Sequence, residues 1–450
     1  MKTFLSDILR GPQDSSREFI SGAVTFGELY ALAGSLYGRF SKIENKSIPV
    51  CLAAEERDLV AAAILAAMAS GVILVLPHSL SKGALLQMRE VTGFTTAVTD
   101  AKLDFPEDTC ILSSVLREGG AKLPEICVNP DVELLQLFTG GSTGTPTIWS
   151  KTIANLFGEA RFMAEEYRVD REDVIVATVT PFHIYGLLFS VLLPLVATAA
   201  VAAETPSFPA EIAGAVSHHA ATVLVSVPAH YRVIADRQLH STLRLAFSSA
   251  GMLDEGDNEQ FCRGNGVGVV EVYGSTETGG LATRNRAEGQ AAFYPLSPVS
   301  WKILRRRLLV NSPFLSPDLP RDEDGFFLSG DLVEQHGEES FFLLGRADSV
   351  TKVGGERVDL DEVRDVIQSQ VAVKECVVVV HGEDTGRGNR IAAMVRGKNI
   401  DIAALRSVLA EVLEPAARPK RILAVKQIPV TANGKYDRQE IYRLLNGCSF

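Results

Sequence analysis

Short runs rich in β-branched residues recur through the first 275 residues, and stretches rich in alanine and leucine separate them. The clearest runs cover residues 47–52, 174–179, 222–227 and 267–273. Strands that alternate with helical stretches are typical of a sheet with helices on its faces. The sequence therefore predicts an α/β fold for most of the chain.

Two longer apolar segments, residues 60–76 and 186–203, are each long enough to cross a bilayer as a single helix. However, Gly71 interrupts the first segment and Pro194 interrupts the second. Each is better explained as a buried helix that leads into a buried strand. We therefore expect no membrane span.

The chain has 450 residues, more than the roughly 100–200 of an ordinary domain, so several units are expected. Layered α/β subdomains and a small β-rich subdomain, at about residues 290–345, would form an N-terminal domain of residues 1–345. We place the main boundary at 345–349, before an α+β C-terminal domain of residues 346–450. The elements expected there are helices near 361–370, 402–413 and 438–445, and strands near 375–380 and 391–395.

The formal net charge of −11 argues against broad binding to nucleic acid or to an anionic membrane. The six cysteines are scattered, with neither a CxxC pair nor the spacing of a metal site. The first residues lack the continuous apolar stretch of a secretory signal. We therefore expect a cytoplasmic protein with reduced cysteines and no nucleic-acid partner.

The most informative segment covers residues 137–147, in which Gly140, Gly141 and Gly144 lie among small hydroxyl residues. Glycine tolerates the backbone angles that let consecutive N–H groups surround an anion, and the hydroxyls add donors. Phosphate is the expected guest, but a Walker P-loop is disfavoured because no lysine follows Gly144. Taken alone, such a segment is more often a flexible turn.

The same segment resembles the phosphate loop TSGSTGxPK of the adenylate-forming superfamily, which includes acyl-CoA synthetases, adenylation domains of nonribosomal peptide synthetases, and luciferases. Further segments resemble the other signature motifs of this family, in the family's order. Six matches in one order identify the chain as a member of this superfamily. The further segments are residues 181–186 (aromatic/His motif), 271–277 (YGxTE), 329–331 (TGD), 345–357 (hinge) and 429–435 (catalytic-lysine loop).

The resemblance implies that ATP activates a carboxylic acid to an acyl-adenylate, with release of pyrophosphate. The two reacting groups are both anions, so positive charge and oriented donors are the main catalytic resource. By the same resemblance, Lys435 would bridge the carboxylate and the α-phosphate, Thr276 would donate to the α-phosphate, and Glu277 would hold Mg²⁺. His183 would border the acid, either as a proton-transfer residue or as a packed wall.

Further binding residues follow from the same motifs. Tyr273 would lie against the adenine, Asp331 would accept hydrogen bonds from the ribose hydroxyls, and Arg346 would contact ribose or phosphate. An interdomain salt bridge is the other interpretation of Arg346. The remaining residues that the resemblance assigns to ATP or CoA binding are Thr139, Gly140, Gly141, Ser142, Thr143, Gly144, Gly251, Gly274 and Lys352.

The resemblance also implies a mobile C-terminal domain. This domain would first present Lys435 and then rotate, with Asp348 at the hinge, to present residues 352–357 for attack by a thiol. The thiol would belong to CoA or to the phosphopantetheine arm of an acyl-carrier protein. The Gly354–Gly355 pair fits a close approach to that arm, and a simple hairpin turn explains it almost as well.

The chain departs from the family pattern in the phosphate loop. Thr147 replaces the lysine that normally helps to hold the β- and γ-phosphates, and Lys151 follows four residues later. ATP would then be held by backbone donors or by Lys151. Gly140 replaces the first loop serine, which a loop of backbone donors tolerates.

No acidic residue lies within residues 181–185, so an α-amino acid substrate is disfavoured. Residues 183–185 resemble the triplet of coumarate-type and fatty-acyl-type ligases, and residues 138–152 resemble compact ligases of aryl polyene and xanthomonadin pigment pathways. An aryl or a medium-chain or unsaturated acid is the expected substrate. Two alternatives stay open: a non-catalytic relative that binds AMP or ATP as a sensor, and an oxidase of the luciferase kind.

Overall fold

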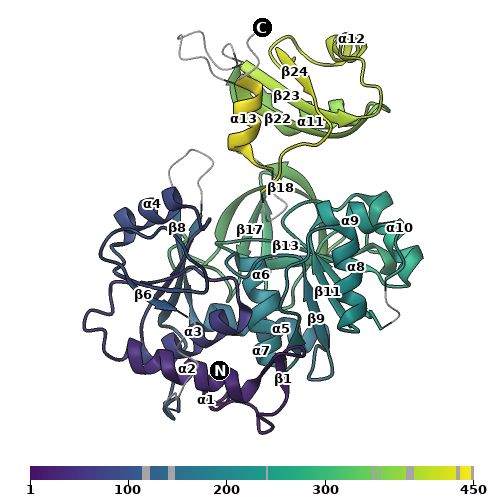
Figure 1. Cartoon of the computed structure of the whole chain (residues 1–450). Coiled ribbons are helices and arrows are strands. Elements are labelled where there is room, and N and C mark those ends of the chain that lie inside the picture. Colours follow the sequence, from purple (N-terminus) through teal and green to yellow (C-terminus); the bar gives the residue numbers. More distant parts are fainter. Residues whose placement is uncertain are drawn as a thin grey trace. The chain divides into compact units, whose positions relative to one another are not determined.

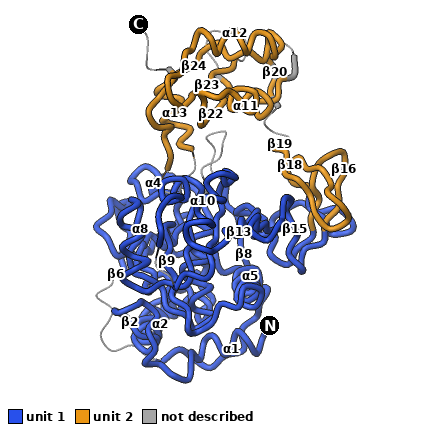
Figure 2. Tube along the Cα trace, turned by 90° about the vertical axis from the view of Figure 1, so that its right-hand side faces the viewer, with its two compact units in different colours: residues 1–300, 311–327 blue, residues 301–310, 328–450 orange. Residues whose placement is uncertain are grey.

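The computed structural model describes residues 1–113, 122–139, 147–239, 242–346, 350–353, 356–381, 390–431 and 436–446 (Figure 1). Its contacts divide the chain into two compact units, coloured separately in Figure 2. The first unit comprises residues 1–300 and 311–327, and the second comprises residues 301–310 and 328–450. The boundary expected at residues 345–349 stays a prediction.

The first unit contains a sheet of nine strands. All pairings among β1 and β9 to β13 are parallel, whereas β2, β14 and β15 add antiparallel edges. In spatial order the strands are β15 (Tyr294–Pro295), β14 (Gly279–Asn285), β13 (Val269–Ser275), β12 (Leu245–Ser248), β11 (Val223–Ser226), β9 (Val174–Ala177), β10 (Ala200–Val201), β1 (Glu18–Ile20) and β2 (Val24–Thr25).

A second sheet of six strands is parallel except for β8, which pairs antiparallel with β7. The predicted phosphate loop connects these two strands. In spatial order the strands are β6 (Cys110–Ser113), β5 (Thr96–Thr99), β3 (Val50–Leu52), β4 (Leu74–Leu76), β7 (Glu133–Thr139) and β8 (Thr147–Thr152).

Helices cover these sheets. For example, Ile212, Tyr231 and Phe261 from three successive helices pack on buried residues of β9, β11, β12 and β13, and Figure 1 shows these helices, α8 to α10, along β11. The helices of the first unit are α1 (Lys2–Arg10), α2 (Phe26–Phe40), α3 (Arg57–Ser70), α4 (Lys82–Thr92), α5 (Ile153–Glu166), α6 (Ile184–Leu187), the π-helix η2 (Leu188–Leu192), α7 (Leu193–Ala197), α8 (Pro209–His218), α9 (Pro228–Ile234), α10 (Glu255–Asn265) and the 3₁₀ helix η3 (Arg286–Glu288).

The two apolar segments fold as predicted. Every residue of α3 is buried, and the helix ends at Gly71, whose left-handed φ of 72° suits glycine before β4 begins. The segment around Pro194 passes through α6, η2 and α7, and then enters β10. Among the described residues, no helix is both long and apolar enough to cross a membrane.

The second unit contains a four-stranded sheet, a hairpin, and a three-stranded sheet with helices. Val395, Ile367 and Leu409 belong to the core between the latter sheet and its helices. The predicted strands and helices of this region are confirmed to within a few residues. Its elements are β16 (Ser300–Leu304), β17 (Arg307–Asn311), β18 (Phe327–His336), β19 (Ser340–Arg346), β20 (Val350–Val353), β21 (Glu356–Asp359), α11 (Leu360–Gln368), β22 (Val373–His381), β23 (Arg390–Gly397), α12 (Ile402–Val412), β24 (Arg421–Ala424) and α13 (Arg438–Asn446).

Candidate active site

Thr276 and Glu277 lie in the tight turn between β13 and β14, and both are half-buried. The hydroxyl of Thr278 closes this turn, because it accepts from the N–H of Ser275 at 2.9 Å. Gly274 is required there: a Cβ at this position would come within 2.2 Å of the Gly279 carbonyl oxygen. The local sequence therefore builds a turn that presents a hydroxyl and a carboxylate from adjacent residues.

Tyr273 comes just before this turn, and aromatic and charged residues support its ring. The ring of Phe293 lies 5.7 Å from it, at an interplanar angle of 53°. The guanidinium of Arg284 covers the Phe293 ring at 4.4 Å. Arg284 is itself fixed by the buried carboxylate of Glu271, with Nη2 and Oε2 2.9 Å apart. The position of Tyr273 is thus set by a chain of contacts that begins inside the sheet.

The structure corrects the sequence interpretation of Lys151, which was considered, besides backbone donors, as a ligand for the phosphates of ATP. Its side chain is 1% exposed. The Nζ atom donates to the carbonyl of Glu277 at 3.1 Å and to that of Phe314 at 2.9 Å. Burial lowers the pKa of Lys151 to about 8, although the carboxylates of Glu159 and Glu277 oppose this shift. Lys151 therefore supports the turn from inside the fold and does not face solvent.

The order of strands in the larger sheet marks a second part of the site. In the sheet, β9 lies between β10 and β11. The chain continues from β9 to β10 on one side of β9 and then to β11 on its other side, so a topological switch point lies between β9 and β11. Ligands of open α/β sheets bind beyond the carboxyl ends of the strands at such a point. At these ends, the hydroxyls of Thr178 and Ser226 lie 2.8 Å apart, and Nδ1 of His230 lies 2.8 Å from Thr178.

The sequence interpretation missed Thr178, Ser226 and His230. Each of the two hydroxyl residues is the next-to-last residue of a predicted strand run (174–179 and 222–227), and no other local signal indicates it. His230 lies 52 residues from Thr178, so no local pattern connects the two. Burial lowers the pKa of His230. A neutral imidazole beside two hydroxyls makes a polar patch at the switch point.

His183 precedes α6, and its ring lies 4.5 Å from that of Phe182 at an interplanar angle of 53°. Two residues later, the hydroxyl of Tyr185 donates to the carbonyl of Ser226 at 3.1 Å. The 181–186 motif is therefore joined to the carboxyl end of β11. Contact with Phe182 agrees with His183 as a packed wall, and its role in proton transfer stays a prediction. Gly251 lies in the loop after β12, where a Cβ would contact Pro228 at 3.7 Å.

Asp331 and Arg346 belong to the second unit, on the paired strands β18 and β19, where they are directly opposite each other. The closest guanidinium and carboxylate atoms are 3.6 Å apart. The Arg346 side chain is 50% exposed and that of Asp331 is 19% exposed. The structure thus brings these two predicted residues together. Lys352 lies on β20, opposite Arg357 of the antiparallel strand β21. The Gly354–Gly355 pair, for which a close approach to the thiol arm or a hairpin turn was considered, lies outside the described residues.

Several predicted site residues lie outside the described part of the chain. These are Lys435, Asp348 and the loop residues Gly140, Gly141, Ser142, Thr143 and Gly144, together with the side chains of Thr139 and Lys352. The strands on either side of the loop are described, and their pairing extends to Thr139 opposite Thr147.

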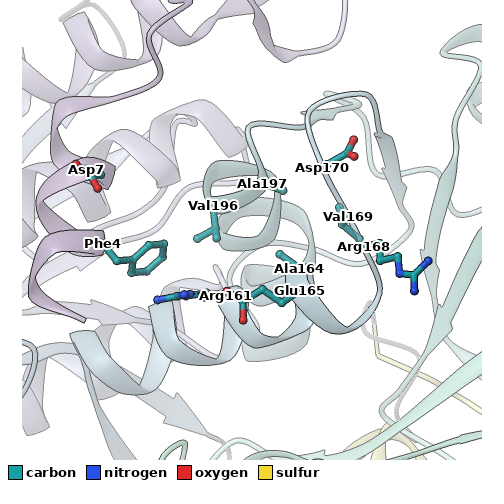
Figure 3. Close-up of a pocket in the computed structure, with 10 residues that line it drawn as sticks. All are labelled: Phe4, Asp7, Arg161, Ala164, Glu165, Arg168, Val169, Asp170, Val196 and Ala197. Carbon is teal, nitrogen blue, oxygen red and sulfur yellow. Dashed lines mark hydrogen bonds and ion pairs between the residues drawn. The ribbon is translucent and has the colours of Figure 1, made fainter.

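A cavity of about 590 Å³ lies elsewhere in the first unit, between α1, α5 and α7 (Figure 3). Two of its charged residues pair with each other: Arg161 Nε lies 2.7 Å from Glu165, and the Arg161 guanidinium covers the ring of Phe4 at 5.1 Å. None of the predicted site residues that the structure describes lines this cavity. The candidate site therefore lies at the β13–β14 turn and the switch point, and this cavity is not part of it.

Comparison with protein families shows to which family the chain belongs. A family described as "AMP-binding enzyme" matches residues 17–305, which is more than half of the chain. The chain belongs to this AMP-binding enzyme family. A second family, "AMP-binding enzyme C-terminal domain", matches residues 362–435. The resemblance inferred from the six motifs is thereby confirmed.

Several relatives of this AMP-binding enzyme are acid–CoA ligases by name, and others are peptide synthases, such as the dimodular nonribosomal peptide synthase of Bacillus subtilis. The chain is 24% identical to the sulfoacetate–CoA ligase of Cupriavidus necator, with 93% of this chain and 92% of that protein covered. It is 25% identical to the indoleacetate–CoA ligase of Aromatoleum aromaticum, with 79% and 77% covered. The structure of ATP-bound MatB from Rhodopseudomonas palustris matches with a TM-score of 0.82 at 20% identity, covering 99% of both chains.

Two predictions are confirmed by these comparisons. The fold is that of the adenylate-forming enzymes, with a large N-terminal and a small C-terminal part. The family and its ligase relatives identify the enzyme class as AMP-forming acid–thiol ligase.

Binding of Mg²⁺ by Glu277 stays a prediction. Among the described residues, no group of three or more histidine, cysteine, aspartate or glutamate side chains is arranged to hold a metal ion. Mg²⁺ is normally bound by one or two carboxylates together with the phosphates of its substrate, not by a cage of protein ligands. The half-buried carboxylate of Glu277 is suited to that mode.

Proposed function

We propose that this AMP-binding enzyme couples an organic acid to AMP, with release of pyrophosphate, and then transfers the acyl group to the thiol of CoA. The arrangement of the β13–β14 turn carries this proposal. It presents the Thr276 hydroxyl and the Glu277 carboxylate beyond the carboxyl end of a parallel strand, where α/β proteins bind nucleotides. The pantetheine arm of a carrier protein is the second possible acceptor.

Adenylation requires two anions to meet. A carboxylate oxygen attacks the α-phosphorus, and the bond from this phosphorus to pyrophosphate breaks. Thr276 donates a hydrogen bond to the α-phosphate, and Lys435 offsets the charge of both reacting groups. Glu277 would hold Mg²⁺, which would supply further positive charge at the phosphate oxygens. In the second unit, Asp331 accepts hydrogen bonds from the ribose hydroxyls.

The second step breaks the acyl–phosphate linkage. The thiol sulfur attacks the acyl carbon, AMP leaves with the oxygen that came from the acid, and the thiol proton passes to solvent. We propose that the C-terminal domain rotates about Asp348 between the two steps, so that Lys435 withdraws and Lys352 approaches. Lys435→Ala should then abolish adenylation while affecting transfer from a supplied acyl-adenylate much less.

For the acid, we propose an aryl compound, with a medium-chain or unsaturated acid as the second choice. Aromatic rings near the switch point support an aryl group: Tyr185 lies 5.1 Å from Phe189, and Phe182 packs on His183. The half-buried imidazole of His230, which is held by the buried hydroxyl of Thr178, suits an acid that carries a polar substituent. Indoleacetate, the substrate named for one relative, is also an aryl acid.

The test is pyrophosphate release with ATP and Mg²⁺ across a panel of short, medium and long fatty acids, hydroxybenzoates, cinnamates and amino acids. Hydroxylamine serves as the acceptor, so the assay assumes nothing about CoA, and Lys435→Ala is the blank. We expect an aryl acid to give the highest rate. If no acid supports pyrophosphate release while ATP still binds, the proposal fails and the nucleotide-sensor alternative is favoured.

A further inference from the structure

Lys151 takes no part in the proposed chemistry, yet the fold buries its charge beneath the site. It lies on β8, the strand that begins directly after the phosphate loop, and it is 1% exposed. Its Nζ atom is bonded to the main chain of Glu277 and of Phe314, at 3.1 and 2.9 Å. One side chain therefore joins the phosphate-loop strand to the turn that carries the metal ligand.

Neighbouring contacts hold the same turn from the same side. Glu159 of α5 is 4% exposed, and its Oε1 atom accepts from the N–H of Gly280 at 2.7 Å. The N–H of Ser316 donates to the Glu277 carbonyl at 2.8 Å, so this oxygen receives two hydrogen bonds. Lys151 contacts the residue that carries the functional carboxylate, whereas Glu159 contacts the strand that follows.

If stability were the only requirement, an apolar side chain would suit this buried position better than a charged one. Apolar side chains of similar volume often serve a fold as well as a buried ion pair, because ions lose their hydration on burial. A charged lysine does what an apolar residue cannot, because it donates to two carbonyl oxygens at once and so fixes the distance between them. Its long stem also reaches from β8 to the turn.

We propose that Lys151 is a positioning residue that fixes the main chain of Glu277, and through it the place of the Mg²⁺-binding carboxylate. This inference rests on the proposed function, because it takes Glu277 as the metal ligand. Loss of the Lys151 amine should free the turn and weaken the binding of ATP that depends on Mg²⁺. Binding of ATP without Mg²⁺ depends on other contacts and should be unchanged.

The test is isothermal titration of the full chain with ATP, once with Mg²⁺ and once with EDTA. The main variant is Lys151→Met with Glu159→Gln, which leaves no unpaired buried charge and keeps an acceptor for Gly280. Glu159→Gln alone is the matched control. Arg244→Met removes another main-chain-bonded cation, which pairs with Asp173 and takes no part in the turn. Thermal unfolding followed by circular dichroism shows that each variant is folded.

We expect the double variant to bind ATP roughly 10-fold more weakly than the wild type in Mg²⁺, and equally well in EDTA. In both single-substitution controls, Mg²⁺ should increase the affinity for ATP as much as it does in the wild type. The half-saturating Mg²⁺ concentration for pyrophosphate release should rise in parallel in the double variant.

Two results would overturn the inference while the proposed function stands. In the first, Mg²⁺ increases the affinity for ATP of the folded double variant as much as that of the wild type. In the second, the double variant loses the same affinity for ATP with Mg²⁺ and with EDTA. The second result would mean that Lys151 supports the fold as a whole. A wild-type chain that binds ATP no better with Mg²⁺ would instead refute the metal role of Glu277 on which this inference rests, whereas the proposed function fails only if no acid supports pyrophosphate release.

Discussion

Two parts of the candidate site hold their charged groups in opposite ways. In the first unit, the turn that carries Glu277 is supported from inside by Lys151 and Glu159, which are 1% and 4% exposed. In the second unit, Asp331 and Arg346 face each other on β18 and β19 at 3.6 Å, and half of the Arg346 side chain is exposed.

The difference separates a supporting charge from a ligand-binding charge. Interactions between charges are stronger in the low-dielectric interior, and the penalty for breaking them is larger. A solvated pair costs little to separate, so each partner stays available for a substrate. We therefore expect Lys151 to matter for the fold and the metal site, and Asp331 to matter for ATP.

The largest effect is expected from Lys151→Met alone, because this change leaves two carbonyl oxygens without their Nζ donor and removes the positive charge that opposes the burial-driven rise in the pKa of Glu159. Removing one member of a buried pair of interacting charges typically costs about 3–5 kcal/mol of unfolding free energy. Urea denaturation followed by circular dichroism measures this change. A loss below 1 kcal/mol, which is the range of exposed pairs, would show that the buried charges of the first unit stabilise the fold no more than the exposed pair of the second unit.

Glu277→Gln should lower the rate of pyrophosphate release roughly 100- to 1000-fold, the usual cost of removing one group that stabilises transition-state charge. Stability should hardly change, because this carboxylate is only half-buried. Glu334→Gln, at an exposed position on β18, is the control and should keep full activity. If Glu277→Gln retained most of the activity, the metal role of the turn would be refuted.

Asp331→Asn should raise the KM for ATP roughly 10- to 150-fold, because a hydrogen bond to a charged group is worth about 1.5–3 kcal/mol. The wild type should also discriminate against 2′-deoxy-ATP, and the variant should lose that preference. Steady-state kinetics with both nucleotides provides the measurement. Equal discrimination by the two proteins would show that Asp331 does not contact the ribose.

The smallest effect is expected from Arg346→Met on stability. An exposed pair contributes about 0–1 kcal/mol, and salt screens it further. Urea denaturation at low and at high salt should show a small loss that disappears at high salt, whereas the loss in Lys151→Met should persist. A salt-independent loss of several kcal/mol would place Arg346 in a structural role comparable with that of Lys151.

Much of the fold could be predicted because it depends on local patterns. The first apolar segment changes from helix to strand after Gly71, as expected, whereas Pro194 lies within the helical run of α6, η2 and α7, which ends with its C-cap Thr198 before β10. The motif residues Asp331 and Arg346 were also expected near one nucleotide, and they pair across β18 and β19.

The roles that depend on tertiary packing could not be predicted in this way. Lys151 follows a phosphate loop in sequence and resembles a ligand, but contacts with Phe314, 163 residues away, hold it in the interior. The partners Thr178 and His230 meet only because β9 and β11 are neighbours in the sheet. Such residues have no local signature, since strand order decides which of them meet.

The central claim is that this chain forms an acyl-adenylate, and oxygen tracing tests it most directly. The best acid of the panel is labelled with ¹⁸O in its carboxylate and incubated with ATP, Mg²⁺ and CoA, and the nucleotide product is analysed by mass spectrometry. If a carboxylate oxygen attacks the α-phosphorus, AMP carries one ¹⁸O atom and pyrophosphate carries none. Unlabelled AMP, or label in inorganic phosphate accompanied by ADP, would contradict the account.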